Sequence, residues 1–168
     1  IILINLIMTF NKIKGISAKS FILIDYNTGT IIAQKDSNSK RNIASITKLM
    51  TSYIIFDYIN KGLLNLDDEV LVSQNAYTQS GSRMFIEIGT LVKIEDLLKG
   101  LIIHSGNDAS IALAEKACGS EEQFVILMNT YAKKLGLKNS KFINPSGLPS
   151  KLPNEVQFMS ASDIVTLS

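Results

Sequence analysis

The sequence predicts an α+β fold in which a short β-hairpin precedes a block of helices. Two β-rich runs, at residues 21–26 and 30–34, lie near the N-terminus, and apolar residues at helical spacing dominate from residue 45 onward. The chain has 168 residues, 46% of them hydrophobic and 19% charged, which suits one globular domain with a sizeable core. Without a linker or an internal repeat, we expect a single domain over residues 18–168.

The two β-rich runs are joined by Asn27-Thr28-Gly29, in which the glycine provides the positive φ of a hairpin turn. Two strands alone are not stable in water, so this hairpin needs further strands or a helix to pack on. The polar residues 35–42 then form a loop that leads into the first helix.

The first helix is expected from about Ser45 to about Lys61, because apolar residues recur at positions 46, 49, 50, 54, 55 and 59. Gly62 follows as a C-terminal cap. The later elements are then expected as short strands at 67–72 and 91–92, one helical turn at 73–77, helices at 94–103, 109–118 and 120–135, a loop at 142–153 and a helix start at 160–163.

Ser45 and Lys48 stand three residues apart on the first helix, which puts both side chains on one face. A serine with a lysine as its base is a known nucleophile pair, and such a lysine needs burial or a neighbouring cation to depress its pKa. The alternative is a helix-start serine beside a solvated lysine. Ser37 and Lys40 have the same spacing in a polar stretch without helical period, and we assign them no function.

Ser105-Gly106-Asn107 lies in the break between two apolar helices. A serine and an asparagine in such a corner either cap the following helix or face a site. His104 precedes them and could form a serine–histidine pair. We favour a packing role for it, since no motif places an acidic residue to orient it and Lys48 already fits the base role.

Composition excludes several classes of function. The formal charge of +2 is not clustered, and no basic stripe carries interleaved aromatic residues, so we expect no nucleic-acid partner. The single cysteine, Cys118, excludes an intramolecular disulfide and is expected to be a buried small hydrophobe. One histidine without a second ligand cluster predicts no metal site.

The first ten residues, from Ile1 to Phe10, form an apolar run that is too short to span a bilayer. Residues 1–17 are expected to be the remnant of a signal peptide, with cleavage points at Gly15, Ser17 and Ala18. The alternative is an ordinary helix or strand that begins at Met8.

Taken together, these motifs resemble the low-molecular-mass penicillin-binding D-alanyl-D-alanine carboxypeptidases, from about residue 18 to the end of the chain. The collinear matches are Ile24-Asp25-Tyr26-Asn27-Thr28-Gly29, Ala44-Ser45-Ile46-Thr47-Lys48-Leu49-Met50-Thr51, Ser105-Gly106-Asn107-Asp108-Ala109, Leu135-Gly136-Leu137-Lys138-Asn139-Ser140 and Ser160-Ala161-Ser162-Asp163. The segment Gly81-Ser82-Arg83-Met84-Phe85 stands between the two serine motifs.

The resemblance implies a β-lactamase/transpeptidase-like fold, of which only the N-terminal hairpin strands of the antiparallel sheet are present. The family's third motif, Lys-Thr-Gly or Lys-Ser-Gly, does not occur in this sequence. Residues 18–168 are therefore expected to be an incomplete D,D-peptidase domain, either a fragment or the product of a split or truncated gene. Such a chain is expected to be weak or inactive alone.

By resemblance, Ser45 attacks the D-Ala-D-Ala peptide bond and forms an acyl-enzyme, while its backbone N–H supplies half of an oxyanion hole. Lys48 takes the serine proton, Ser105 relays a proton to the leaving amine, and Asn107 binds the substrate and Lys48. No metal or organic cofactor is implied.

The implied partners are peptidoglycan pentapeptides ending in D-Ala-D-Ala, with β-lactam antibiotics as inhibitors. Export to the periplasm or cell envelope is expected, and membrane association only through segments absent here.

Three alternatives remain. A D,D-endopeptidase of the same family would share these motifs, and a catalytically dead penicillin- or peptidoglycan-binding module would explain the missing third motif. A β-lactamase is disfavoured, because no Glu-x-x-Leu-Asn follows the Ser105 motif to position a deacylating water.

Overall fold

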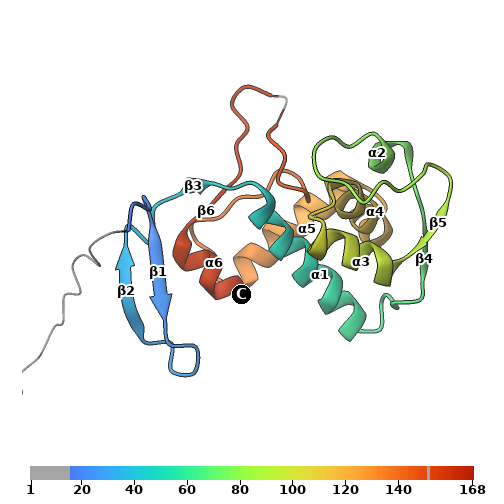
Figure 1. Cartoon of the computed structure of the whole chain (residues 1–168). Coiled ribbons are helices and arrows are strands. Elements are labelled where there is room, and N and C mark those ends of the chain that lie inside the picture. Colours follow the sequence, from blue (N-terminus) through green and yellow to red (C-terminus); the bar gives the residue numbers. More distant parts are fainter. Residues whose placement is uncertain (1–15, 151) are drawn as a thin grey trace, which may run out of the picture.

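The computed structural model describes residues 16–150 and 152–168. The chain divides into an N-terminal hairpin on one side and a block of helices on the other (Figure 1). Strands β1 (Phe21–Ile24) and β2 (Ile31–Lys35) form the hairpin, and helix α6 (Ala161–Leu167) lies between it and the helical block. The predicted α+β class is confirmed.

The hairpin has the predicted strands and turn. Leu23 pairs with Ala33 in an antiparallel register, and Gly29 has a φ of 69°. The side chain of Asp25 accepts a hydrogen bond from the backbone N–H of Thr28 at 2.8 Å, and this bond stabilises the turn. The support that two strands need comes from α6, which packs on β1.

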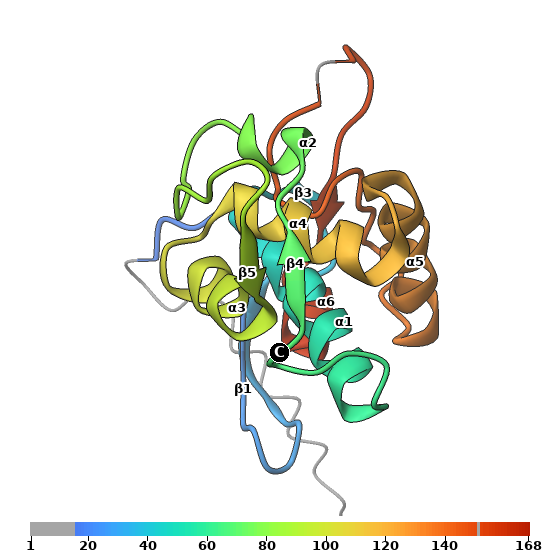
Figure 2. The same cartoon turned by 90° about the vertical axis from the view of Figure 1, so that its right-hand side faces the viewer.

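The other strands form two further antiparallel pairs. Strands β4 (Glu69–Leu71) and β5 (Leu91–Lys93) pair as Val70 with Val92 and run side by side in Figure 2. Both were expected from the sequence. The pair formed by β3 (Arg41–Asn42) and β6 (Phe158–Met159) was not, because two residues carry no readable alternation and their partners lie far apart in the chain.

The first helix begins where it was expected but not as an α-helix. Ser45–Thr47 is a single 3-10 turn, and α1 follows over Lys48–Asn60. Gly62 ends it with a φ of 68°, and its N–H donates to the carbonyl of Ile59. The serine and the lysine of the motif therefore belong to different types of turn.

Helix α4 (Asn107–Cys118) lies at the centre of the block and packs against α1, α2 (Gln74–Tyr77), α3 (Ile94–Ile103) and α5 (Glu121–Lys134). Its residues 107–114 are all buried. The expected start at Ala109 is wrong by two residues, because Ser110 already donates its N–H to the carbonyl of Gly106. Asn107 is consequently the first residue of the helix.

Three serines cap helices in the structure. Ser73, Ser120 and Ser160 each accept a backbone N–H from the residue three positions on, at the starts of α2, α5 and α6. Cys118 departs from its prediction, since it is half-buried and not fully buried. Burial nevertheless raises the pKa of its thiol.

The predicted signal segment, residues 1–17, lies almost entirely outside the described residues. Within the described part of the chain, no helix combines the length and the apolar character needed to cross a membrane.

Candidate active site

The predicted serine and lysine face each other at the start of the first helix. Ser45 is exposed on the 3-10 turn, whereas Lys48 is only 5% exposed at the first position of α1. Lys48 Nζ lies 3.3 Å from Ser45 Oγ, so the two side chains share one face as their spacing predicts. An accessible hydroxyl is therefore in hydrogen-bond contact with a buried amine.

Lys48 is held by two further contacts, both with neutral oxygens. Its Nζ lies 2.7 Å from Asn107 Oδ1 and 2.6 Å from the carbonyl oxygen of Ser146. Burial lowers the pKa of Lys48 to about 8. Among residues 16–150 and 152–168, this lysine forms no salt bridge that would oppose the shift.

Asn107 is fixed from the side facing away from Lys48. Its Nδ2 donates to the carbonyl of Ser80 at 2.7 Å, and its backbone N–H donates to the carbonyl of Ser82 at 2.7 Å. A carbonyl accepts but cannot donate, so the amide nitrogen faces the loop and the amide oxygen faces the lysine. The contact between Asn107 and Lys48 joins residues that are 59 positions apart in the chain.

Ser105 is strained and its hydroxyl has no partner. Its φ is 54°, a left-handed conformation that costs a non-glycine residue conformational energy. Its Oγ is buried and is the one such side-chain atom without a hydrogen bond in the described part of the chain. Ser105 therefore lies two residues before Asn107 in the chain, but its hydroxyl forms no hydrogen bond with Ser45 or Lys48.

The segment around Ser146 is a part of the site that the sequence analysis missed. Thr51 donates its hydroxyl to the carbonyl of Pro145 at 2.7 Å, which anchors the segment to α1. Gly147 has a φ of 91°, and a Cβ there would lie 2.1 Å from the carbonyl oxygen of Ala44. The sequence predicts only a loop here, and the glycine of the Pro-Ser-Gly run is the one signal that marks this close approach.

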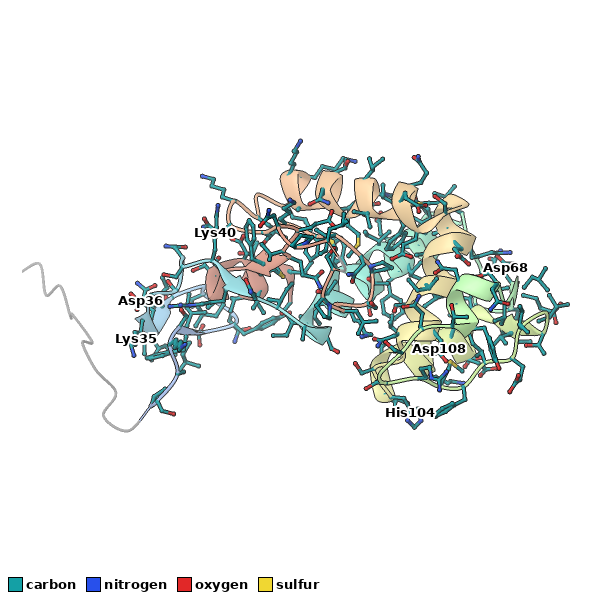
Figure 3. The ribbon with its side chains drawn as sticks, turned by 90° about the horizontal axis from the view of Figure 1, so that it is seen from above. Lys35, Asp36, Lys40, Asp68, His104 and Asp108 are labelled. Carbon is teal, nitrogen blue, oxygen red and sulfur yellow. The ribbon has the colours of Figure 1, made fainter. Side chains whose placement is uncertain are left out.

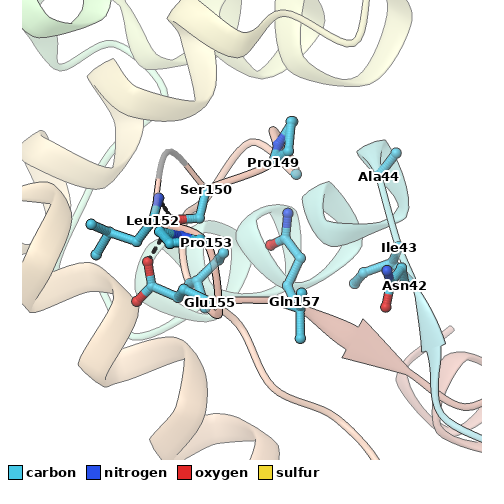
Figure 4. A pocket seen from close by; sticks show the side chains of 12 residues that line it. Asn42, Ile43, Ala44, Pro149, Ser150, Leu152, Pro153, Glu155 and Gln157 are labelled. Carbon is cyan, nitrogen blue, oxygen red and sulfur yellow. Dashed lines mark hydrogen bonds between the residues drawn. The ribbon is translucent and has the colours of Figure 1, made fainter.

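A cavity of about 480 Å³ adjoins the site on the side of Ala44 (Figure 4). Residues 42–44 form one wall, and the segment with Pro149, Ser150 and Gln157 forms the other. Ser45 follows Ala44 directly but does not line the cavity itself. The cavity therefore begins one residue away from Ser45.

His104 takes no part in this arrangement. It is exposed at the end of the molecule opposite Lys35 and Lys40 (Figure 3), which fits the preference against a serine–histidine pair. Over residues 16–150 and 152–168, no three His, Cys, Asp or Glu side chains are grouped so that they could hold a metal ion.

Comparison with known proteins gives one consistent family. The family model described as D-alanyl-D-alanine carboxypeptidase matches residues 8–168. The chain is 43% identical to D-alanyl-D-alanine carboxypeptidase DacF of Bacillus subtilis (strain 168), over 90% of this chain and 38% of the relative. It is 33% identical to a D-alanyl-D-alanine endopeptidase of Pseudomonas aeruginosa, over 80% of this chain and 43% of the relative.

The fold gives the same grouping. The crystal structure of penicillin binding protein 6B from Escherichia coli superposes with a TM-score of 0.84 at 39% identity, covering 94% of this chain and 50% of that one. The predicted β-lactamase/transpeptidase-like fold is thereby confirmed. The chain spans 38% of the length of the Bacillus relative.

Proposed function

This chain belongs to the D-alanyl-D-alanine carboxypeptidase family, and from that premise we propose that it supplies the nucleophile and base of a serine-type D-Ala-D-Ala carboxypeptidase. The substrates in this proposal are peptidoglycan stem peptides ending in D-Ala-D-Ala, and the intermediate is an acyl-enzyme on Ser45. The chain covers 38% of the Bacillus relative, so the activity, substrates and partners of the whole relative are proposals here.

The set of contacts around Lys48 carries the proposal. A neutral amine has two N–H donors and one lone pair. The two closest oxygens, on Ser146 and Asn107, accept the two N–H groups at 2.6 Å and 2.7 Å. The lone pair is then left for the Ser45 hydroxyl at 3.3 Å. A pKa of about 8 leaves a useful fraction of the amine neutral near neutral pH.

In the proposed reaction, Ser45 Oγ attacks the carbonyl carbon between the two D-alanines while its proton passes to Lys48 Nζ. The backbone N–H of Ser45 donates to the oxyanion that forms, a contribution worth about a hundredfold or more in rate. The C–N bond then breaks and the terminal D-alanine leaves as an amine. Water hydrolyses the remaining ester and restores Ser45.

Ser105 is proposed to carry the proton to that leaving amine. The buried Oγ without a partner supports this role, because a strained residue with an unused hydroxyl is costly to keep in a purely structural position. Asn107 is proposed to bind the substrate backbone in addition to Lys48. The mechanism uses no metal and no organic cofactor.

The proposed setting is the periplasm or cell envelope, where peptidoglycan lies. β-Lactam antibiotics are the proposed inhibitors, since the similar Escherichia coli structure is that of a penicillin binding protein. An apolar N-terminal run supports export. N-terminal sequencing of the protein from its host should give a start near Ala18 or Lys19, and an intact start at Met8 would contradict export.

The test is a chimera in which residues 18–168 replace the matching part of the Bacillus subtilis relative. We expect it to release D-alanine from a diacetyl-Lys-D-Ala-D-Ala peptide and to lose this activity at least about a thousandfold in the Ser45→Ala variant. Ser37→Ala is the matched control, because Ser37 has the same spacing to a lysine and should leave the rate unchanged. Equal losses in both variants would contradict the proposal.

A D,D-endopeptidase is the second candidate, supported by the identity with the Pseudomonas aeruginosa enzyme. The same chimera separates the two when it is offered a cross-linked stem-peptide dimer. Cleavage of the cross-link in preference to the terminal D-alanine would favour the endopeptidase. Penicillin binding without either hydrolysis would favour an inactive binding module.

A further inference from the structure

Asp108 is a buried carboxylate that the proposed mechanism does not use. It is 1% exposed, at the second position of α4 and next to Asn107 in the chain. Its oxygens do not face the lysine. They accept the backbone N–H groups of Met84 at 3.1 Å, Phe85 at 2.8 Å and Ile86 at 3.4 Å, so one side chain holds three consecutive residues of another segment.

The segment that Asp108 holds is continuous with the one that orients Asn107. The carbonyls of Ser80 and Ser82 accept the side-chain and backbone N–H groups of Asn107, only two residues before the N–H groups held by Asp108 begin. We refer to residues 80–86 as the brace loop. Neighbouring residues of α4 thus bind its two ends, Asn107 at 80–82 and Asp108 at 84–86.

The backbone geometry of this contact is costly, which indicates that it is specified. Phe85 has a φ of 63°, a left-handed conformation that persists in a bulky residue only where the surroundings impose it. Its N–H forms the shortest of the three bonds to Asp108. A Cβ on Gly106 would lie 2.9 Å from Asp108 Oδ1, so the carboxylate also depends on a glycine beside it.

We propose that Asp108 is a positioning residue for the Lys48 base, acting through the brace loop and the amide of Asn107. The carboxylate holds the loop, the Ser80 carbonyl holds the amide nitrogen, and the amide oxygen accepts one N–H of the lysine. Without the carboxylate the loop moves and the amide rotates. Lys48 then loses the acceptor that directs its lone pair toward Ser45.

This inference rests on the proposed function of Lys48 and adds a residue to it. The groups that face the amine are all uncharged: Ser45 from the 3-10 turn, Ser146 from a loop and Asn107 from α4. The carboxylate of Asp108 is turned toward the brace loop. Because burial keeps the pKa of Lys48 low, water admitted by a displaced loop should raise it.

The test compares Asp108→Asn with Asp163→Asn. Asp163 is a matched control, since it is also buried and its carboxylate also accepts a backbone N–H from a remote loop, that of Asn139 at 2.7 Å. The readout is an NMR titration of the Lys48 side chain in the 168-residue chain. We expect Asp108→Asn to raise the midpoint by about one pH unit or more, and Asp163→Asn to leave it unchanged.

A second variant tests the contact between the brace loop and the amide of Asn107 from an exposed position, Gly81. A Cβ on Gly81 would lie 3.0 Å from Asn107 Nδ2, so Gly81→Ala should disturb the amide and shift the Lys48 titration in the same direction. If Asp108→Asn does not fold while Asp163→Asn does, Gly81→Ala decides the outcome. An unchanged Lys48 midpoint in the folded variants would overturn the inference.

In the chimera, Asp108→Asn should slow acylation by a penicillin about tenfold to a hundredfold, as expected for a misplaced base. The NMR titration needs no catalysis. Its failure is therefore distinct from failure of the proposed function, which would appear as full D-alanine release by Ser45→Ala. Acylation at the parent rate by a folded Asp108→Asn chimera would also overturn the inference.

Discussion

Helix α4 and the β1–β2 hairpin bury their apolar side chains to very different degrees. On α4, Ile111 and Leu113 are buried completely among four other helices. In the hairpin, Leu23 and Ile31 are each 50% exposed, and Ala33 is the buried residue of β2. Ser45, Lys48 and Asn107, the candidate site residues, therefore belong to the helical block and not to the weakly buried hairpin.

Helix α1 shows the same contrast on its two faces. Met50, Ile54 and Ile55 point into the core and are fully buried. The opposite side carries half-exposed apolar residues at Leu49, Tyr53 and Phe56, and Ile46 on the preceding 3-10 turn is half-exposed as well. Helix α1, which carries Lys48, is therefore held in place by the packing of its buried face. Substitutions that disturb this packing should also disturb the position of Lys48.

The largest expected effect is on chemistry within the helical block. Lys48→Arg keeps a positive charge but cannot lose its proton, so acylation of the chimera by a penicillin should fall by about a thousandfold or more. The fold should survive, which circular dichroism checks. A near-normal acylation rate would mean that another group acts as base and that Lys48 of the helical block is not needed for the reaction.

The next effect concerns the core that supports the site. Leu113→Ala removes a fully buried side chain from α4 and should lower the free energy of unfolding by about 2–5 kcal/mol. Urea unfolding followed by far-UV circular dichroism measures it. A loss below about 1 kcal/mol would show that the helical block is not the stable part of the molecule.

The pH dependence of stability reports on the burial of Lys48. Its pKa is about 8 in the folded chain against 10.5 for the free side chain, so the unfolded chain binds more protons between these values. The contribution of Lys48 to the free energy of unfolding therefore rises as the pH increases from 8 to 10.5, by at most about 3 kcal/mol. Below pH 8 the full penalty of burying the charged amine applies.

Comparison with Lys48→Met isolates this contribution, because the other titrating groups are common to both chains. Unfolding free energies measured by urea from pH 7 to pH 10.5 should rise in the parent relative to the variant. A constant difference over this range would mean that Lys48 is solvated and keeps its ordinary pKa.

The smallest effect is expected in the hairpin. Ile31→Ala removes a half-exposed side chain and should change the free energy of unfolding by less than about 1 kcal/mol. The measurement is urea unfolding of the 168-residue chain, because in the chimera the hairpin would also contact residues of the relative. A loss in the 168-residue chain as large as that of Leu113→Ala would abolish the contrast between the two regions.

Sequence reasoning predicted the local elements of both regions and missed what joins distant segments. The Ser45–Lys48 pair, the helix starts near Ser120 and Ser160, and the hairpin turn follow from spacing of four residues or fewer. The contact of Lys48 with the Ser146 carbonyl does not, since any residue can offer a carbonyl and only Gly147 marks the close approach. The sequence placed the start of α4 two residues late, and the bond from the N–H of Asn107 to the carbonyl of Ser82 is another contact that local spacing does not show.

The sequence motifs also did not reveal how Asn107 reaches Lys48. Their resemblance to the family implied the contact, but the direction of the amide is set by the Ser80 carbonyl, which accepts its N–H, while the Ser82 carbonyl accepts the backbone N–H of Asn107. A polar Ser/Gly loop gives no sign that two of its carbonyls accept hydrogen bonds from the same residue, Asn107. Such information exists only once the chain has folded.

The central claim is that Ser45, activated by Lys48, is the nucleophile. The most direct measurement is to incubate the chimera with a penicillin, digest it, and locate the acyl adduct by mass spectrometry. We expect one adduct on the peptide that contains Ser45, and none on that residue in the Ser45→Ala or Lys48→Arg variants within the time that labels the parent. An adduct on Ser37, Ser105 or any other residue would contradict the claim.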